Sequence, residues 1–173
     1  MIPLIALSVV LVVLVVAIVA VVVVKASDSG EGTDDVAVDD CVVGSWRVTS
    51  HRESVVVDGG SSVQFSGSGA TVRLSADGKG VTDYGDGTTF FASVAGIRVE
   101  LVFKGTISYD FATSNGSITF SNVQADGTAT LYQGGVEATS QPLNSDTTPS
   151  KYTCEGDKLV QNTELADIEM ARQ

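Results

Sequence analysis

The first 24 residues of this 173-residue chain contain no charged side chain, and this feature limits most strongly what the chain can be. Residues 2–24 are aliphatic apart from Pro3 and Ser8. A helix of this length would span about 34 Å, enough to cross a hydrocarbon core of about 30 Å. All charged residues lie from Lys25 onward. The pattern excludes a simple cytosolic globule and a protein with several membrane spans.

Residues 1–25 are therefore expected to form one uncleaved transmembrane helix. A cleavable signal peptide has a basic N-terminal region and a shorter apolar core of about 7–15 residues, and neither feature is present. The alternative is secretion after cleavage near Val24-Lys25-Ala26, which resembles a weak cleavage site. The expected location is the cell membrane, with a single pass and with the membrane itself as a partner.

The chain after the apolar segment is acidic. Residues 26–40 carry six acidic side chains and no basic one, and they are expected to be a disordered linker. The whole chain has a net charge of −11. This balance argues against binding to nucleic acid or to anionic lipid surfaces.

Cys41 and Cys154 are the only cysteines and lie near the two ends of residues 41–173. The chain has one histidine and no C-x-x-C motif, so no metal site is predicted. A disulfide over this span would contribute at most about 4–5 kcal/mol. Two buried, unpaired thiols are the alternative. Because disulfides persist in oxidising compartments, the domain is expected to be extracytoplasmic.

Residues 41–173 are predicted to be all-β, as an antiparallel up-and-down β-barrel of about 8–10 strands. Apolar and polar residues alternate between turns such as Asn115-Gly116, and no stretch has convincing helical periodicity. The clearest strand is Ile97–Phe111, in which the alternation continues through Gly105 and predicts a bend there. Tight turns without helices are typical of a barrel or a sandwich.

The turns also predict which residues pair across strands. A two-residue turn at Asn115-Gly116 pairs Phe111 with Phe120. A three-residue loop at 125–127 then pairs Phe120 with Tyr132 and keeps one face apolar. The predicted ligand-binding side chains form two inward rows, Phe111, Phe120 and Tyr132 in one, and Tyr109, Asn122 and Thr130 in the other.

Two further turns and one histidine complete these expectations. A three-residue loop at 76–78 pairs Val72 with Thr82. A turn at Glu155-Gly156 pairs Tyr152 with Leu159. By alternation from Trp46, the side chain of His51 is expected on the solvent face.

The start of the domain resembles a known family. Gly44-Ser45-Trp46 is similar to the Gly-x-Trp signature that opens the barrel of lipocalin-like (calycin-type) proteins, including bacterial membrane-anchored ones. The resemblance implies that Trp46 packs across the closed end of a barrel and that a late arginine, here Arg172, lies over it.

The functional hypothesis is a membrane-anchored, extracytoplasmic, lipocalin-like domain that binds a small apolar ligand inside its barrel. The alternative is a structural or protein-interaction module at the cell surface, with a filled barrel and no ligand. No pair of carboxylates projects from an apolar face in the way that acid/base catalysis requires, so no enzyme activity is expected. No cofactor is predicted, and protein partners are not specified by the sequence.

Overall fold

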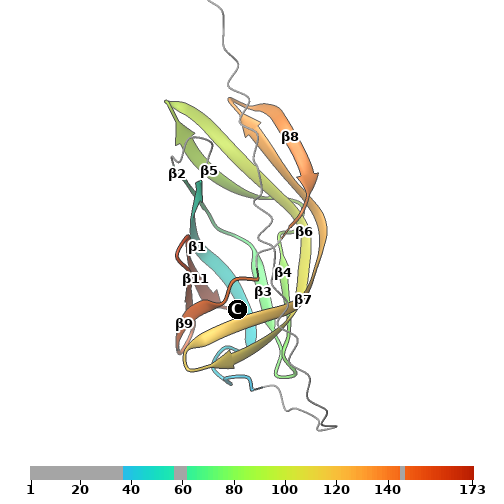
Figure 1. The fold of residues 1–173 in the computed structure, drawn as a ribbon, viewed down its shortest axis with the longest axis vertical. Coiled ribbons are helices and arrows are strands. Elements are labelled where there is room, and N and C mark those ends of the chain that lie inside the picture. The colour runs from blue at the N-terminus through green and yellow to red at the C-terminus, as the bar shows by residue number, and fades with distance from the viewer. Residues whose placement is uncertain (1–36, 57–61, 145–146) are drawn as a thin grey trace, which may run out of the picture.

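The computed structural model describes residues 37–56, 62–144 and 147–173, which form one antiparallel sheet of eleven strands (Figure 1). The strands are β1 (Gly44–Val56), β2 (Ser62–Gly67), β3 (Thr71–Leu74), β4 (Lys79–Asp83), β5 (Thr88–Val94), β6 (Ile97–Ser114), β7 (Ser117–Gln133), β8 (Val136–Pro142), β9 (Ser150–Glu155), β10 (Lys158–Asn162) and β11 (Ala166–Arg172). The predicted membrane helix lies outside the described residues. Within those residues, no helix has the length and apolar character needed to span a bilayer.

The sheet closes into a ring because its first and last strands pair. β1 pairs with β11 along most of its length, and β6 pairs with β7 to join the two halves of the ring. β2 and β3 both pair with β1, β4 and β5 with β6, and β8 and β9 with β7. Short interruptions thus divide three long strand paths into two strands each. The strand count is therefore higher than the predicted 8–10.

The two longest strands bend together at a pair of glycines. Gly105 of β6 pairs with Gly127 of β7, and its φ is +100°. A Cβ atom on Gly105 would lie 2.1 Å from the Asp126 carbonyl oxygen, so the two backbones approach too closely for any side chain. The predicted bend at Gly105 is confirmed. The predicted loop at 125–127 is wrong, because Gly127 belongs to the bend and the chain reverses at Gly134-Gly135.

Two of the other predicted pairings are confirmed and one is wrong. Phe111 pairs with Phe120, and Val72 pairs with Thr82. In the last hairpin, however, the closing pair is Glu155 and Lys158, so the turn lies at 156–157 rather than at Glu155-Gly156. This moves the register by one residue on each strand, and Tyr152 faces Gln161 instead of Leu159.

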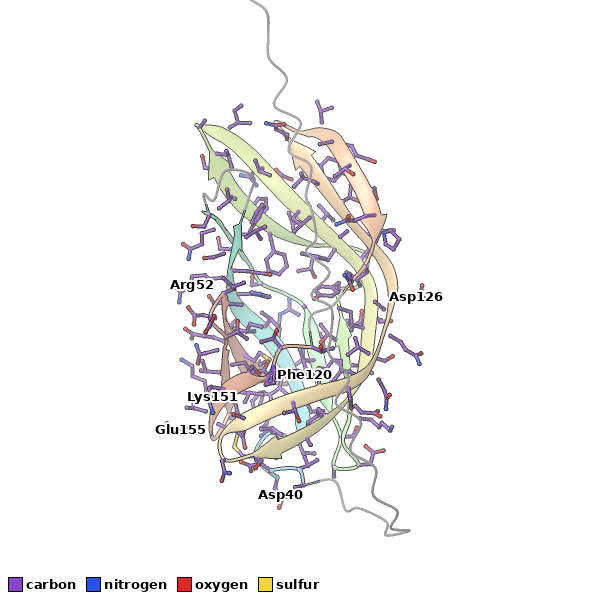
Figure 2. The ribbon with its side chains drawn as sticks, viewed as in Figure 1. Asp40, Arg52, Phe120, Asp126, Lys151 and Glu155 are labelled. Carbon is purple, nitrogen blue, oxygen red and sulfur yellow. A yellow bond between two sulfur atoms is a disulfide. The ribbon has the colours of Figure 1, made fainter. Side chains whose placement is uncertain are left out.

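Apolar side chains fill much of the ring in three clusters. One cluster surrounds Trp46 and Met170, a second surrounds Phe90 and Leu131, and a third surrounds Ile107. In Figure 2, Phe120 lies within the outline of the sheet, whereas the exposed side chains of Arg52 and Asp126 point away from it on opposite sides. The core therefore lies inside the ring and is built from one face of the sheet.

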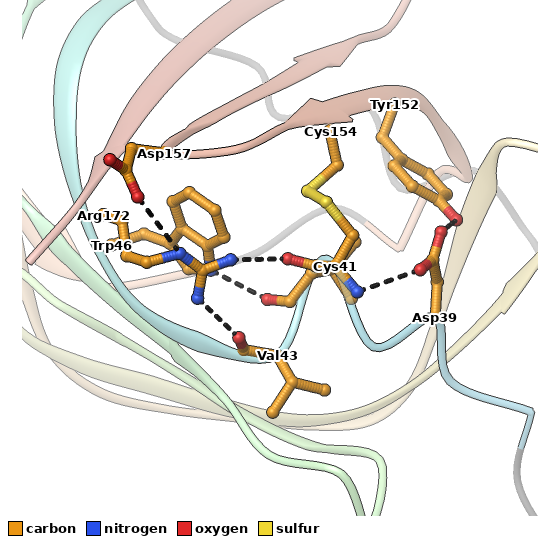
Figure 3. The surroundings of a disulfide bond; sticks show 9 residues. Asp39, Cys41, Val43, Trp46, Tyr152, Cys154, Asp157 and Arg172 are labelled. Carbon is orange, nitrogen blue, oxygen red and sulfur yellow. Dashed lines mark hydrogen bonds and ion pairs between the residues drawn. A yellow bond between two sulfur atoms is a disulfide. The ribbon is translucent and has the colours of Figure 1, made fainter.

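One end of the ring is held by the disulfide and the single tryptophan (Figure 3). Cys41 and Cys154 are bonded across 113 positions of sequence, which confirms the predicted bridge. Trp46 is fully buried, and its indole Nε1 donates a hydrogen bond of 2.8 Å to the carbonyl oxygen of Val42. The segment before β1 therefore folds back under the ring instead of leaving it.

Arg172 joins the two ends of the domain at the same place. Its guanidinium carbon lies 4.2 Å from the centroid of the Trp46 ring, so the contact implied by the family resemblance is present. Its two terminal nitrogens donate hydrogen bonds of 2.8 Å to the carbonyl oxygens of Val43 and Cys41. One side chain of the last strand thus satisfies two carbonyl groups of the segment that leads into the first strand.

The contacts of the domain begin before Cys41. The Asp39 amide donates a hydrogen bond of 2.7 Å to Thr113 Oγ1, and the Thr113 amide donates one of 2.8 Å to the Ala37 carbonyl. The Asp39 carboxylate accepts hydrogen bonds from the Cys41 amide and from the Tyr152 hydroxyl, which hold the pKa of Asp39 below its usual value. The last residues of the predicted linker, 37–40, therefore pack against the sheet.

Replacing Arg172 with alanine is expected to lower the free energy of unfolding by about 2–4 kcal/mol, because two charge-assisted hydrogen bonds and the contact with Trp46 are lost together. Urea unfolding of the full chain in mild detergent, followed by Trp46 fluorescence, measures this loss. Arg47→Ala, at an exposed position of β1, is the control and should change stability by less than about 0.5 kcal/mol. Equal effects of the two substitutions would contradict the assigned role.

Gly105→Ala is expected to cost more than about 3 kcal/mol, because the new methyl group requires a shift of the β7 backbone as well as a strained φ. Gly134→Ala serves as the matched control. Gly134 also has a positive φ, of +57°, but no atom within 4 Å of an added Cβ, so its substitution should cost only about 1–2 kcal/mol. Similar losses for both variants in the same unfolding experiment would show that the close approach is unimportant.

Candidate functional site

A cavity of about 260 Å³ lies inside the ring. Residues of β1, β3, β4, β6, β7, β9, β10 and β11 contribute to its wall. The non-aromatic apolar residues of its lining are Val48, Ala70, Val72, Ile107, Val123, Leu165, Ala166, Ile168 and Met170. Leu165 and Thr148 are exposed lining residues and mark the side on which the cavity opens to solvent. The volume exceeds the roughly 150 Å³ that holds a benzene molecule in an engineered apolar cavity.

A β-bulge in β1 directs two polar residues into this cavity. Val48 pairs with Met170 and Ser50 pairs with Glu169, so Thr49 is an extra residue without a partner in β11. The extra residue reverses the alternation of the strand. His51 and Glu53 consequently line the cavity. The expectation that His51 faces solvent is wrong for this reason.

The side chain of His51 is held in place by packing, but its Nε2 atom has no hydrogen-bond partner. The imidazole packs edge-on against Phe90, with 4.9 Å between the ring centroids. Its Nε2 atom is buried, has no hydrogen-bond partner and lies 3.5 Å from Oε2 of Glu53. The Glu53 side chain is 45% exposed. A buried nitrogen next to a hydrated carboxylate is a suitable place for a polar group of a ligand.

Aromatic side chains form another part of the wall. Tyr84, Tyr109 and Phe120 all line the cavity, and the rings of Tyr109 and Phe120 meet edge to face at 5.3 Å. Burial, and then the negative charge of Glu53, raise the pKa of Tyr84 to about 12. Burial also raises the pKa of Tyr109, whose hydroxyl lies 3.3 Å from Thr82 Oγ1. Both phenols are therefore neutral at physiological pH.

Ser150 supplies a second unsatisfied polar atom. This residue of β9 is only 4% exposed, lines the cavity, and its Oγ has no hydrogen-bond partner. Leaving a buried hydroxyl unpaired costs about 1–3 kcal/mol, so such groups usually face a water molecule or a ligand. The cavity thus combines a largely apolar wall with a small number of polar groups, as small-molecule sites do.

Of the six residues predicted to bind a ligand, two line this cavity. Tyr109 and Phe120 contribute to the wall as described. Phe111 is 2% exposed and belongs to the cluster around Trp46. Thr130 is buried, and its hydroxyl lies 2.9 Å from the Ser140 hydroxyl on β8, so its polar group is already paired.

A second bulge, in β7, explains why the prediction for Asn122 is wrong. Ser108 pairs with Gln124 and Asp110 with Ser121, so β7 has two residues opposite the single Tyr109. Asn122, one of the two, has a φ of +50°, is exposed, and donates a hydrogen bond of 2.6 Å to Asp110. After this bulge the alternation of β7 is reversed, which is why Val123 lines the cavity.

The position of Tyr132 follows from the same shift. Tyr132 lies beyond the bulge on β7 and pairs with Glu100 and Glu137 instead of Phe120. By alternation it shares a face with Thr130, opposite Ala129 and Leu131 of the core. The predicted row Phe111–Phe120–Tyr132 is therefore correct for the pair Phe111–Phe120 and wrong at Tyr132. The predicted row Tyr109–Asn122–Thr130 is wrong after Tyr109.

Sequence reasoning missed His51, Glu53, Tyr84 and Ser150. One signal for the first two was present in β1, because Val48 and Val55 are seven positions apart. Two apolar residues at an odd spacing cannot share a face of a regular strand, so a bulge between them is required if both point inward. Val55 does pack against the cluster around Phe90. Nothing comparable in the sequence marks Ser150.

Comparisons of the chain with protein-family models, with curated proteins and with solved structures give no match. The chemistry of the site therefore has to be inferred from its geometry. A partly open cavity with a wall of apolar and aromatic groups, a carboxylate, an imidazole and an unpaired hydroxyl is suited to holding a small molecule with one polar end.

The raised pKa of Tyr84 predicts a specific loss of stability at high pH. Between about pH 10 and about pH 12 the unfolded chain releases this phenolic proton while the folded chain keeps it, so stability falls as pH rises. The loss of folding free energy from this one phenol reaches about 2–3 kcal/mol. Urea unfolding at about pH 9 and about pH 11.5 should show a smaller decrease for Tyr84→Phe than for the wild type. Identical decreases would contradict the assignment.

Proposed function

We propose that the ring-closed sheet is a lipocalin-like β-barrel that binds a small, largely apolar molecule in its interior. The single observation that carries the proposal is the cavity of about 260 Å³ with an apolar wall and few polar groups. A barrel that serves only as a structural module needs no such space, because packing of its own side chains is more favourable than a void.

The end of the ring that holds Trp46 and Arg172 supports the proposal that the barrel is lipocalin-like. Trp46 follows Gly44 at the start of β1 and packs under Arg172 of the last strand. This is the arrangement that the resemblance to lipocalin-like barrels implies. The two short strands on either side of each interruption together form one strand path. Successive strand paths then lie next to each other around the ring, which also agrees with an up-and-down barrel.

The proposed location is the extracytoplasmic face of the cell membrane, with residues 1–25 as a single-pass anchor. The Cys41–Cys154 disulfide supports an oxidising compartment. The apolar residues 2–24 support attachment to a membrane. A carrier held at this position would bind its ligand outside the cytoplasm and next to the lipid surface.

Binding of 2-naphthol by the full chain in mild detergent tests the proposed function. This probe is neutral at pH 7, is similar in size to the cavity, and is excited at wavelengths where Trp46 does not absorb. The wild type is expected to change the probe's emission in a saturable way. Ala166→Leu, which adds volume to the cavity wall, should weaken binding by at least about tenfold, or about 1.4 kcal/mol.

Ala76→Leu is the matched control, because Ala76 is exposed in the turn between β3 and β4 and lies outside the cavity lining. It should bind the probe as the wild type does. Trp46 emission and the urea midpoint show whether each variant is folded. The proposal fails if the folded wild type binds no probe, or if Ala166→Leu and Ala76→Leu bind it equally well.

A further inference from the structure

The charge inside the cavity indicates what kind of polar end a ligand would carry. Glu53 is the one carboxylate among the described residues that line the cavity, and no lysine or arginine belongs to that lining. The nearest candidate for a compensating charge is His51, whose imidazole is neutral unless it binds a proton. A cavity with an uncompensated carboxylate favours a cation and disfavours an anion.

The arrangement around Glu53 also matches the hydrogen bonding of a cation. Oε2 of Glu53 and Nε2 of His51 are 3.5 Å apart, so one donor atom placed beside both can reach each of them at ordinary hydrogen-bond length. Nε2 of His51 has no partner, and neither has Oγ of Ser150, which is 4% exposed and lines the same cavity. Neutral imidazole and hydroxyl groups can both accept hydrogen bonds.

The aromatic part of the cavity wall also suits an organic cation. Tyr84, Tyr109 and Phe120 present aromatic rings to the cavity, and aromatic faces attract ammonium groups by about 0.5–2 kcal/mol. The negative charge of Glu53 reaches Tyr84, since it contributes to the raised pKa of that phenol. The net charge of −11 would also draw cations toward the protein.

We propose that the ligand is a small primary amine with an apolar body, bound as its ammonium form by Glu53. The proposal rests on the proposed carrier function and names its ligand class. The ammonium group donates to the Glu53 carboxylate and to Nε2 of His51, and the apolar body lies against the aromatic and aliphatic wall. A fatty acid or another carboxylate is disfavoured because it would place a second negative charge beside Glu53.

Displacement of 2-naphthol from the full chain by three ligands of similar shape tests this assignment. Benzylamine is a cation at pH 7, benzyl alcohol is neutral, and benzoate is an anion. The wild type should be half displaced by benzylamine at a concentration at least about tenfold lower than by benzyl alcohol. Benzoate should be the weakest of the three.

Glu53→Gln removes the charge with little change in shape and should reduce the preference for benzylamine over benzyl alcohol to less than about twofold. Glu155→Gln is the matched control, because Glu155 is exposed at the end of β9 and outside the cavity lining. It should keep the wild-type preference. Trp46 emission and the urea midpoint again report folding of each variant.

The outcomes separate the two proposals. If 2-naphthol binds but benzyl alcohol displaces it as well as benzylamine does, the amine assignment is overturned and the carrier function stands. The same holds if folded Glu53→Gln keeps the wild-type preference. If the folded wild type binds no 2-naphthol, the carrier function is overturned, and the amine assignment that rests on it is overturned with it.

Discussion

Pairing between the first strand and the last closes the sheet of this domain into a ring. A twisted antiparallel sheet has two open edges unless its outer strands meet, and here β1 and β11 meet along most of their length. Arg172 secures this closure by binding the carbonyl groups of Cys41 and Val43 and by covering Trp46. The disulfide fixes the same segment to β9. An interior exists only because the ring is closed.

Local breaks in regular strand geometry then decide what that interior contains. The extra residue Thr49 in β1 directs His51 and Glu53 inward. Asn122, in its left-handed conformation on β7, faces outward and leaves Val123 in the cavity wall. Gly105 and Gly127 let two long strands bend around the cavity instead of ending beside it. Each feature costs regular backbone pairing or conformational freedom, and the two bulges change which side chains form the wall of the cavity.

The polar groups of the cavity are unusual for a core that is only structural. A closed apolar interior is most stable without a carboxylate and without unpaired polar atoms. Glu53 stays partly hydrated at 45% exposure, whereas His51 Nε2 and Ser150 Oγ are buried and unpaired. Such groups reduce stability in the empty state and become favourable when a ligand supplies the missing partners. A ligand that supplies these partners would fit both the proposed carrier function and the proposed ligand class.

The all-β class, the disulfide and the long strand through Gly105 could be predicted from the residues alone. They follow from composition, from the presence of only two cysteines and from the alternation of apolar and polar residues, whereas the contact between Trp46 and Arg172 was implied by a family resemblance. Of the six residues predicted to bind a ligand, only Tyr109 and Phe120 lie in the cavity wall. The other residues of the wall could not be predicted, because one inserted residue reverses every later side chain of a strand, and pairing with a distant neighbour fixes where the insertion lies.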